Sequence, residues 1–308
     1  MIVSIKKRRL PLILAIVCLS LLPLVFGQVL RGFGVELWIT NNNPDAVLDT
    51  NRSSMTFDPS AGGTIRAFFI FNVTDTNGED DVNEAGAYFN LTLGTANPQY
   101  RSNITCRNIS KVPADNKVIF NCSVRLKYFD NASSNWVINF TVADNNGGTA
   151  KNDSRRFTYN TLSSLSFARS FINFSSLNLG QSNQQASAPL VLNNTGNDDF
   201  NQINISAATL FGVDVPSESI GSSSFTVNGT DNGAGNGMPL ANGELTIRAL
   251  TGNLSLNHGH TSANTDYYDT VLSPRGNQSL YFWVDVPSSG ISSQKYNNTW
   301  NITVINLP

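Results

Sequence analysis

The chain is poor in the residues from which most catalytic and metal sites are built. It has two histidines and three cysteines in 308 residues, and charged residues make up only 14%, against an ordinary share of about 25%. Two histidines make a histidine-built zinc or catalytic site hard to assemble, and so few cysteines exclude a disulfide-dense small scaffold. The formal net charge of −2 provides no basic excess for nucleic acid. We therefore expect neither a histidine-based enzyme nor a nucleic-acid partner.

The N-terminus has the pattern of an export signal. Four consecutive cations at residues 6–9 precede an apolar run from residue 10 to 26, and a basic head before such a run is typical of a secretory signal. Residues 1–27 are predicted to be a helical signal peptide cleaved before Gln28. The alternative is an uncleaved membrane anchor, since the run matches the shortest spanning helices. The predicted location is extracellular or at the cell surface, with membrane contact only through this segment if it is uncleaved.

Asparagine is strongly over-represented. The chain has 40 asparagines, and 17 of them stand in the N-glycan acceptor pattern Asn-x-Ser/Thr, where chance alone would place about 7. The excess predicts a glycoprotein, and a polar surface without sugar is the alternative. The candidate acceptors are Asn51, Asn72, Asn90, Asn103, Asn108, Asn121, Asn131, Asn139, Asn152, Asn173, Asn193, Asn204, Asn228, Asn253, Asn277, Asn297 and Asn301.

Two cysteines, Cys106 and Cys122, lie outside the predicted signal segment. An even number of cysteines in an exported chain predicts one disulfide. Closing a loop of about 16 residues would stabilise the fold by roughly 3 kcal/mol in the chain-entropy model. A metal pair is less favoured because no histidine or third cysteine is at hand. A redox pair is less favoured because the spacing is not Cys-x-x-Cys.

The hydrophobic pattern predicts an all-β protein. Apolar and polar residues alternate over short runs, for example at 64–74 and 136–142, and turn residues interrupt the runs about every ten positions. A Ser-rich join begins at Leu162. We predict two tandem antiparallel β-sandwich domains of immunoglobulin-like type after the N-terminal segment. Their predicted boundaries are 28–161 and 162–308, the second with long polar loops at 228–242 and 257–269.

Two motifs in the first predicted domain resemble turns of prokaryotic surface proteins. Val73-Thr-Asp75-Thr-Asn-Gly78 is followed by an acidic turn and Val82. It resembles the strand and Asp-x-x-Gly turn of immunoglobulin-like surface domains. Val142-Ala-Asp144-Asn-Asn-Gly147 repeats the pattern before the last predicted strand of the domain.

The second predicted domain adds to this resemblance. Asn178-Leu-Gly180 and residues 189–196 resemble the Asn-Thr-Gly hairpin of archaeal and bacterial envelope sandwiches. Val286-Pro287 with residues 296–300 is similar to their last hairpin. With its dense sequons and few cysteines, the chain resembles secreted archaeal immunoglobulin-like cell-surface proteins over most of residues 34–308. The resemblance implies a sandwich fold, a surface location, and a role in adhesion, envelope structure or filament assembly.

One acidic turn has the composition of a calcium site. It collects oxygen ligands around Gly78, and calcium takes six to eight hard oxygens. The spacing does not match the twelve-residue EF-hand loop, and a solvated acidic turn is the simpler interpretation. No cofactor is required, and calcium is the best-motivated metal. Its candidate ligands are Asp75, Asn77, Asp80, Asp81 and Glu84.

Other chemistry is weakly supported. His258 and His260 stand together in a polar stretch that favours a solvated loop over a zinc site. No Gly-x-Ser-x-Gly elbow, phosphate loop or dinucleotide fingerprint occurs in the sequence. The four tryptophans lie in strand-like runs, where a buried core is the ordinary interpretation and a sugar-stacking platform the alternative. Paired carboxylates for glycoside hydrolysis remain open.

These observations predict a secreted, N-glycosylated envelope protein with a structural or adhesive role and no catalytic activity. Its expected partners are other envelope proteins, cell-surface glycans or further copies of itself. The alternative function is extracellular carbohydrate binding, with or without calcium.

Overall fold

The computed structural model describes residues 12–14, 35–37, 40–95, 99–103, 106–174, 176–200, 202–231, 233, 237–240, 243–248, 256 and 276–305. Regular structure in these residues is almost entirely strand, and the only helical elements among them are two single turns of 3₁₀ helix. These turns are Pro113–Asp115 and Ser222–Ser224. None of the described helices is long and apolar enough to cross a membrane. The prediction of an all-β protein built from antiparallel sheets is confirmed.

Little of the N-terminal segment is described. Strand β1 (Leu12–Leu14) pairs antiparallel with β2 (Val35–Leu37). These three residues of the predicted signal or anchor are therefore extended, and the structure does not confirm a helix there. The rest of residues 1–27, including the predicted cleavage site before Gln28, lies outside the described residues.

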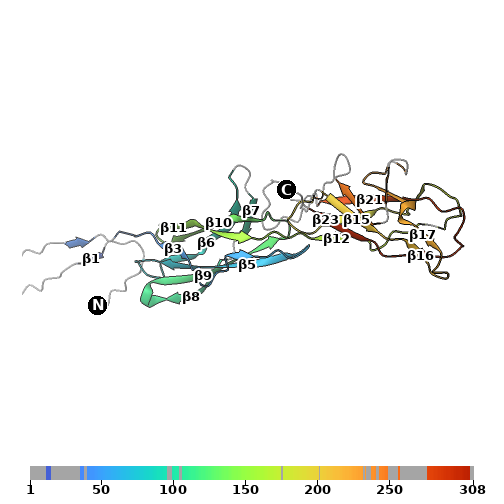
Figure 1. Cartoon of the computed structure of the whole chain (residues 1–308). Coiled ribbons are helices and arrows are strands. Elements are labelled where there is room, and N and C mark those ends of the chain that lie inside the picture. The colour runs from blue at the N-terminus through green and yellow to red at the C-terminus, as the bar shows by residue number, and fades with distance from the viewer. Residues whose placement is uncertain are drawn as a thin grey trace, which may run out of the picture.

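Two sheets form the first half of the chain (Figure 1). Neighbouring strands are antiparallel except that β4 (Thr56–Phe57) runs parallel to β11 (Thr149–Tyr159). One sheet has the order β3 (Asp45–Leu48), β5 (Thr64–Thr74), β9 (Lys117–Lys127), β8 (Cys106–Val112). The other has the order β4 (Thr56–Phe57), β11 (Thr149–Tyr159), β10 (Ser133–Asp144), β6 (Val82–Leu93), β7 (Gln99–Asn103).

The two sheets pack face to face through a phenylalanine-rich core. Alternation along β5 points Phe69 and Phe71 inward, and both are fully buried. Phe71 stacks on Phe140 of the opposite sheet with ring centroids 4.2 Å apart, and Phe69 lies 5.4 Å from Phe89. Large buried rings dominate the energetics of such a core. The alternating pattern therefore produces a sandwich whose stability rests on contacts between sheets.

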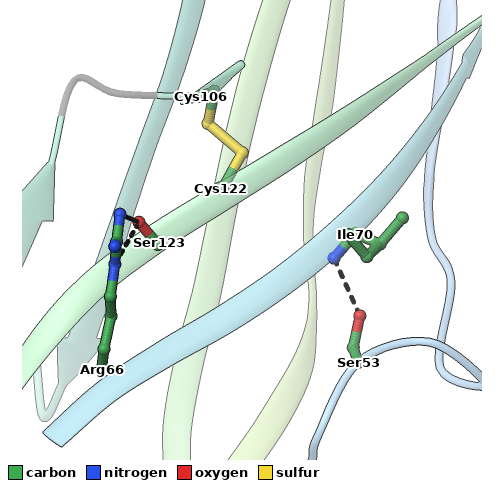
Figure 2. Close-up of a disulfide and its surroundings, with 6 residues drawn as sticks. All are labelled: Ser53, Arg66, Ile70, Cys106, Cys122 and Ser123. Atoms are coloured by element: carbon green, nitrogen blue, oxygen red, sulfur yellow. Dashed lines mark hydrogen bonds between the residues drawn. A yellow bond between two sulfur atoms is a disulfide. The ribbon is translucent and has the colours of Figure 1, made fainter. Parts of the chain in front are cut away.

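The predicted disulfide is present in one sheet of this half (Figure 2). Cys106 on β8 and Cys122 on β9 lie directly opposite each other in the strand register and are bonded. The bond thus links two neighbouring strands of the same sheet and does not bridge the two sheets.

On β5, the backbone amide of Ile70 donates to the buried Ser53 hydroxyl at 2.9 Å.

The second half contains shorter strands in three groups. In the largest sheet the order is β12 (Leu165–Phe167), β14 (Leu190–Asn194), β21 (Asn277–Val284), β18 (Phe225–Asn228), β19 (Met238–Pro239), with β13 (Gln184–Gln185) also pairing with β21. The smaller sheets have the orders β20 (Gly243–Arg248), β15 (Gln202–Ala207), β23 (Asn301–Ile305) and β17 (Ser219–Ile220), β16 (Leu210–Gly212), β22 (Tyr296–Asn297).

Buried apolar side chains form two separate clusters, one in each half. The first cluster runs from Ala46 to Tyr159, and the second runs from Ala186 to Val284. Figure 1 shows the two sets of strands arranged end to end. Of the two predicted polar loops, 257–269 lies outside the described residues and 228–242 is described in part.

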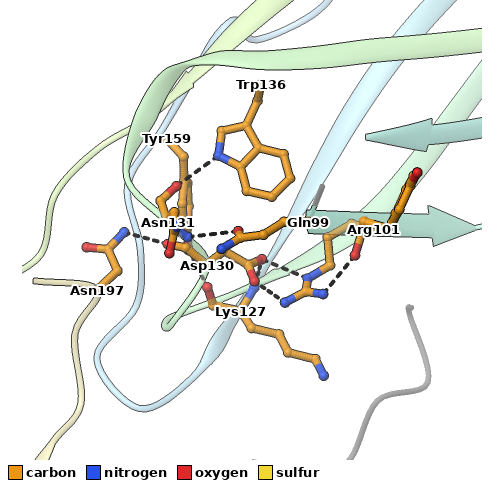
Figure 3. A network of polar contacts seen from close by, with 9 residues as sticks. Gln99, Arg101, Lys127, Asp130, Asn131, Trp136, Tyr159 and Asn197 are labelled. Carbon is orange, nitrogen blue, oxygen red and sulfur yellow. Dashed lines mark hydrogen bonds and ion pairs between the residues drawn. The ribbon is translucent and has the colours of Figure 1, made fainter. Parts of the chain in front are cut away.

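The halves meet at the turn between β9 and β10 (Figure 3). Asn197, which follows β14, is buried and donates from Nδ2 to the carbonyls of Asp130 and Asn160, each at 3.0 Å. Its Oδ1 accepts from the backbone amide of Leu162 at 2.6 Å. One asparagine of the second half therefore satisfies two backbone carbonyls at the end of the first half and one amide at the start of its own.

A buried ion pair lies next to this junction, because Asp130 takes part in both (Figure 3). The side chains of Arg101 on β7 and Asp130 are 0% exposed and form a salt bridge. Arg101 Nε donates to Asp130 Oδ2 at 2.9 Å, and the Lys127 amide donates to the same oxygen at 2.8 Å. Burial raises the pKa of Asp130, and the guanidinium opposes that rise. The carboxylate thus depends on Arg101 to remain charged in the core.

Candidate metal centre

Two turns with the same sequence pattern lie at one end of the first-half sandwich. Asp75 begins the turn after β5, and Asp144 begins the turn after β10. In each turn the aspartate Oδ1 accepts a hydrogen bond of 2.8 Å from the backbone amide two residues further on. The closing glycines Gly78 and Gly147 have φ angles of 113° and 92°, a backbone region that residues other than glycine avoid. The repeated motif therefore specifies the same turn twice.

Strand pairing brings the two turns together with Asp81. Asp144 stands opposite Val82, the first residue of β6, in the β10–β6 register. Asn146 Nδ2 donates to both carboxylate oxygens of Asp81, at 2.9 and 2.7 Å. As a result Asp75, Asp81 and Asp144 each offer a carboxylate oxygen, and these oxygens lie within 4.8 Å of one another.

The two turn aspartates are buried. Asp75 is 1% exposed and Asp144 is 3% exposed, whereas Asp81 is half-buried. Oδ2 of Asp75 is buried and has no hydrogen-bond partner. Every ion pair among the described residues lies elsewhere. Three carboxylates therefore share a small volume in which no cationic side chain of the described residues pairs with them.

The surroundings shift the pKa values of Asp75 and Asp144 in opposite directions. Burial raises the pKa of Asp75, and the nearby charges of Asp81 and Asp144 raise it further, against a lowering hydrogen bond from the Asn77 amide. Burial also acts to raise the pKa of Asp144. Hydrogen bonds from Asn41 and from backbone amides of its own turn outweigh that effect, and the pKa falls below its ordinary value. Asp75 is thus the carboxylate with the least support for its charge.

The segment Asn41–Asn43, which leads into the first half, contacts this cluster. Asn41 Nδ2 donates to Asp144 Oδ2 at 2.7 Å, and the backbone amide of Asn42 donates to Asn77 Oδ1 at 3.0 Å. A Cβ added at Gly148 would lie 2.7 Å from Asn43 Oδ1 and closer still to Asp144 Oδ2. Glycine at 148 therefore leaves room for these oxygens to converge.

Only part of the predicted calcium ligand set comes together. Asp75 and Asp81 lie in the cluster, and Asn77 lies in the same turn with its Oδ1 held by Asn42. Asp80 and Glu84 instead pair with Lys111 Nζ on β8, at 3.2 and 2.9 Å. Lys111 lowers the pKa of Glu84. The ammonium group of Lys111 thus balances part of the charge of these two acids.

Sequence reasoning did not include Asp144 in this site. The signal that could have found it was the repeated Asp-x-x-Gly turn, with one copy after each of two strands. Asn41 and Asn43 gave a weaker signal, as part of a polar run just before the first strand of the sandwich. Neither signal states that the two turns are neighbours, because that depends on which strands pair.

The sequon asparagines whose side chains are described stay out of the core. Fifteen of the 17 have a described side chain, and each of these is exposed or half-buried. The side chains of Asn103 and Asn253 lie outside the described residues. Strands β7, β8 and β23 stand at sheet edges and carry the sequons at Asn103, Asn108 and Asn301.

The described tryptophans give no sugar-stacking platform. Trp136 and Trp283 are buried, and half-buried Trp300 packs edge to face on Phe225. Trp38, His258 and His260 lie outside the described residues, as do Asp266 and Asp269 beside the histidines. The prediction that most strand tryptophans serve the core is confirmed for Trp136 and Trp283.

No protein-family model matches this chain, and no curated protein sequence matches it either.

Proposed function

We propose that the first half is an immunoglobulin-like domain. If β3, β5, β9 and β8 are strands A, B, E and D, the first sheet has the immunoglobulin order. Strands β11, β10, β6 and β7 then become G, F, C and C′ of the second sheet. The disulfide joins strands D and E, whereas antibody domains bridge strands B and F across the sheets. We also propose the domain boundaries 28–161 and 162–308, supported by the two separate buried clusters.

We infer that the protein is a secreted, N-glycosylated cell-surface protein with a structural or adhesive role and no catalytic activity. The observation that carries the inference is the placement of the sequons. With an excess of acceptors over chance, none of the fifteen described sequon side chains is in the core. Sugar on the exposed sequons, such as Asn51 and Asn297, would displace no core side chain. At edge strands it would prevent sheets from pairing between molecules.

A structural role is supported by the end-to-end arrangement and the junction. A spacer must hold its halves in a fixed relation, and the buried Asn197 contacts provide such a link. Partners would be other envelope proteins, surface glycans or further copies of the chain. Nucleic acid is not expected as a partner.

Glycan mapping tests the surface assignment. The protein purified from its own cells is digested, and sugar-bearing peptides are identified by mass spectrometry before and after release of N-linked sugar. We expect sugar on exposed sequons such as Asn51 and Asn297. Asn42 is equally exposed but has no sequon, so it is the internal control. Unmodified sequons throughout, on protein recovered from the cell interior, would contradict the proposal.

Light scattering on the purified glycoprotein tests the structural role. Large assemblies, with calcium or with chelator, are expected of an envelope or filament component. A monomer in both conditions would count against self-assembly. It would direct the search to a ligand or glycan bound by a single copy.

A further inference from the structure

The cluster of Asp75, Asp81 and Asp144 holds three carboxylates close together without a counter-charge from any described ion pair. Like charges at this separation repel strongly where water is excluded. Buried charges in proteins are normally paired or bind metal ions. No ion pair within the described part of the chain supplies that charge, and a bound cation would balance the three carboxylates.

The orphaned oxygen of Asp75 is a separate indication of a ligand. Nearly every buried polar atom in a folded protein has a partner, yet Asp75 Oδ2 is buried and receives no hydrogen bond. The other oxygen, Oδ1, is already held by the amide of Asn77. Oδ2 is thus the atom left for coordination, at a residue that is 1% exposed.

We propose that Asp75, Asp81 and Asp144 bind one calcium ion, and that the ion fastens the segment Asn41–Asn43 to the end of the first-half sandwich. The donor set found among the described residues is all oxygen, from carboxylates and neighbouring asparagine amides. Calcium accepts six to eight such ligands in flexible geometry, whereas magnesium demands a near-ideal octahedron. Ligands from three separate segments suit the flexible coordination of calcium better than the near-ideal octahedron of magnesium.

The asparagine segment can complete the coordination shell. Asn41 contacts Asp144 Oδ2 through its amide group, and rotating that amide presents oxygen in place of nitrogen. Asn43 Oδ1 already lies in the space above Gly148 beside Asp144. Both residues stand just before β3, so a bound ion would fix the chain where it enters the sandwich. This proposal does not depend on the surface role inferred above.

The experiment is calcium titration of the purified full chain, with calorimetry for binding and thermal unfolding for stability. Extracellular calcium modules bind with dissociation constants of about 10⁻⁴ to 10⁻³ M. At tenfold that concentration, ligand binding should raise the midpoint of first-half unfolding by roughly 5 °C. Chelator should reverse the rise.

Asp75→Asn is the test variant and Asp80→Asn the matched control. Both remove one charge from the same turn, but Asp80 has a 68% exposed side chain paired with Lys111 and lies outside the cluster. We expect Asp75→Asn to lose calcium binding and the calcium-dependent rise in midpoint. In chelator it should unfold at or above the wild-type temperature, because one repulsive charge is gone. Asp80→Asn should keep the full calcium response.

In calcium the wild type should unfold at a higher temperature than Asp75→Asn, and in chelator it should not. A variant that failed to fold would be less stable in both conditions, so the comparison distinguishes lost binding from failed folding. A second variant, Asp81→Asn, changes the most accessible of the three carboxylates and should lose calcium in the same way. The proposal is overturned if calcium gives the wild type neither heat of binding nor a higher midpoint. It is equally overturned if Asp80→Asn loses the response as much as Asp75→Asn, or if magnesium at equal concentration stabilises the protein as well as calcium does.

Discussion

Removing Arg101 should destabilise the first half more than any exposed charge change. The Arg101→Met substitution keeps an unbranched apolar stem but removes the guanidinium, so Asp130 stays buried without its partner. Asp130 would keep the hydrogen bond from the Lys127 amide. Burial already raises its pKa, so the carboxyl must then become protonated or admit water.

The size of the effect follows from the complete burial of both partners. Breaking one side of a buried pair costs about 3–5 kcal/mol, because the remaining charge is uncompensated. The matched control is Arg52→Met, which breaks the pair with Asp49 at a side chain that is 46% exposed. Exposed pairs contribute only about 0.2–1 kcal/mol.

Urea unfolding followed by circular dichroism measures both variants. With a slope of about 1–3 kcal/mol per molar urea, Arg101→Met should lower the midpoint by at least about 1 M, and Arg52→Met should barely change it. Adding Asp130→Asn to Arg101→Met should recover part of the loss, since the orphaned charge is then absent. A cost below about 1 kcal/mol for Arg101→Met would refute the reasoning, because burial of an unpaired carboxylate would then be tolerated.

Three further outcomes are expected. Replacing Cys106 and Cys122 together by alanine should lower the free energy of unfolding by about 3 kcal/mol, and an unchanged urea midpoint would contradict this. Asn197→Ala leaves the carbonyls of Asp130, which is buried, and Asn160, which is half-buried, without this donor. It should cost about 1–3 kcal/mol and speed proteolysis between the halves; equal cleavage rates for the variant and the wild type would argue against the junction. Hydrogen bonds from Ser292, Gln294 and Tyr296 lower the pKa of Glu218 to about 2. Its stabilising effect should therefore be complete above its ordinary pKa of 4.5 and disappear as the pH falls toward 2. Amide exchange at Ser292, measured by NMR, should speed up only near the lower value.

Local patterns were sufficient for several features. Alternation along residues 64–74 and 136–142 predicted strands, and both became core strands of the first half. Two cysteines outside the predicted export signal predicted one disulfide, which the structure contains. These inferences succeed because strand periodicity and turn chemistry act over a few residues.

Contacts between residues far apart in the chain could not be predicted from the sequence. Asp80 and Glu84 look like calcium ligands beside Asp75, yet Lys111 on β8 neutralises both. Asp144 joins Asp75 although the two are far apart in the chain, because β10 pairs with β6. Likewise nothing local marks Asn197 as the residue that binds the carbonyl of Asp130.

The sequence by itself determined core strands such as 64–74 and 136–142, the two Asp-x-x-Gly turns, the disulfide partners and the positions of the sequons, since each depends largely on local residue types. Tertiary structure alone decided which turns meet, which acids share a counter-charge and which oxygen of Asp75 is left buried and unpartnered. The physical reason is that pairing register and sheet order place residues from distant segments side by side. Electrostatic sites are formed by such neighbours in space.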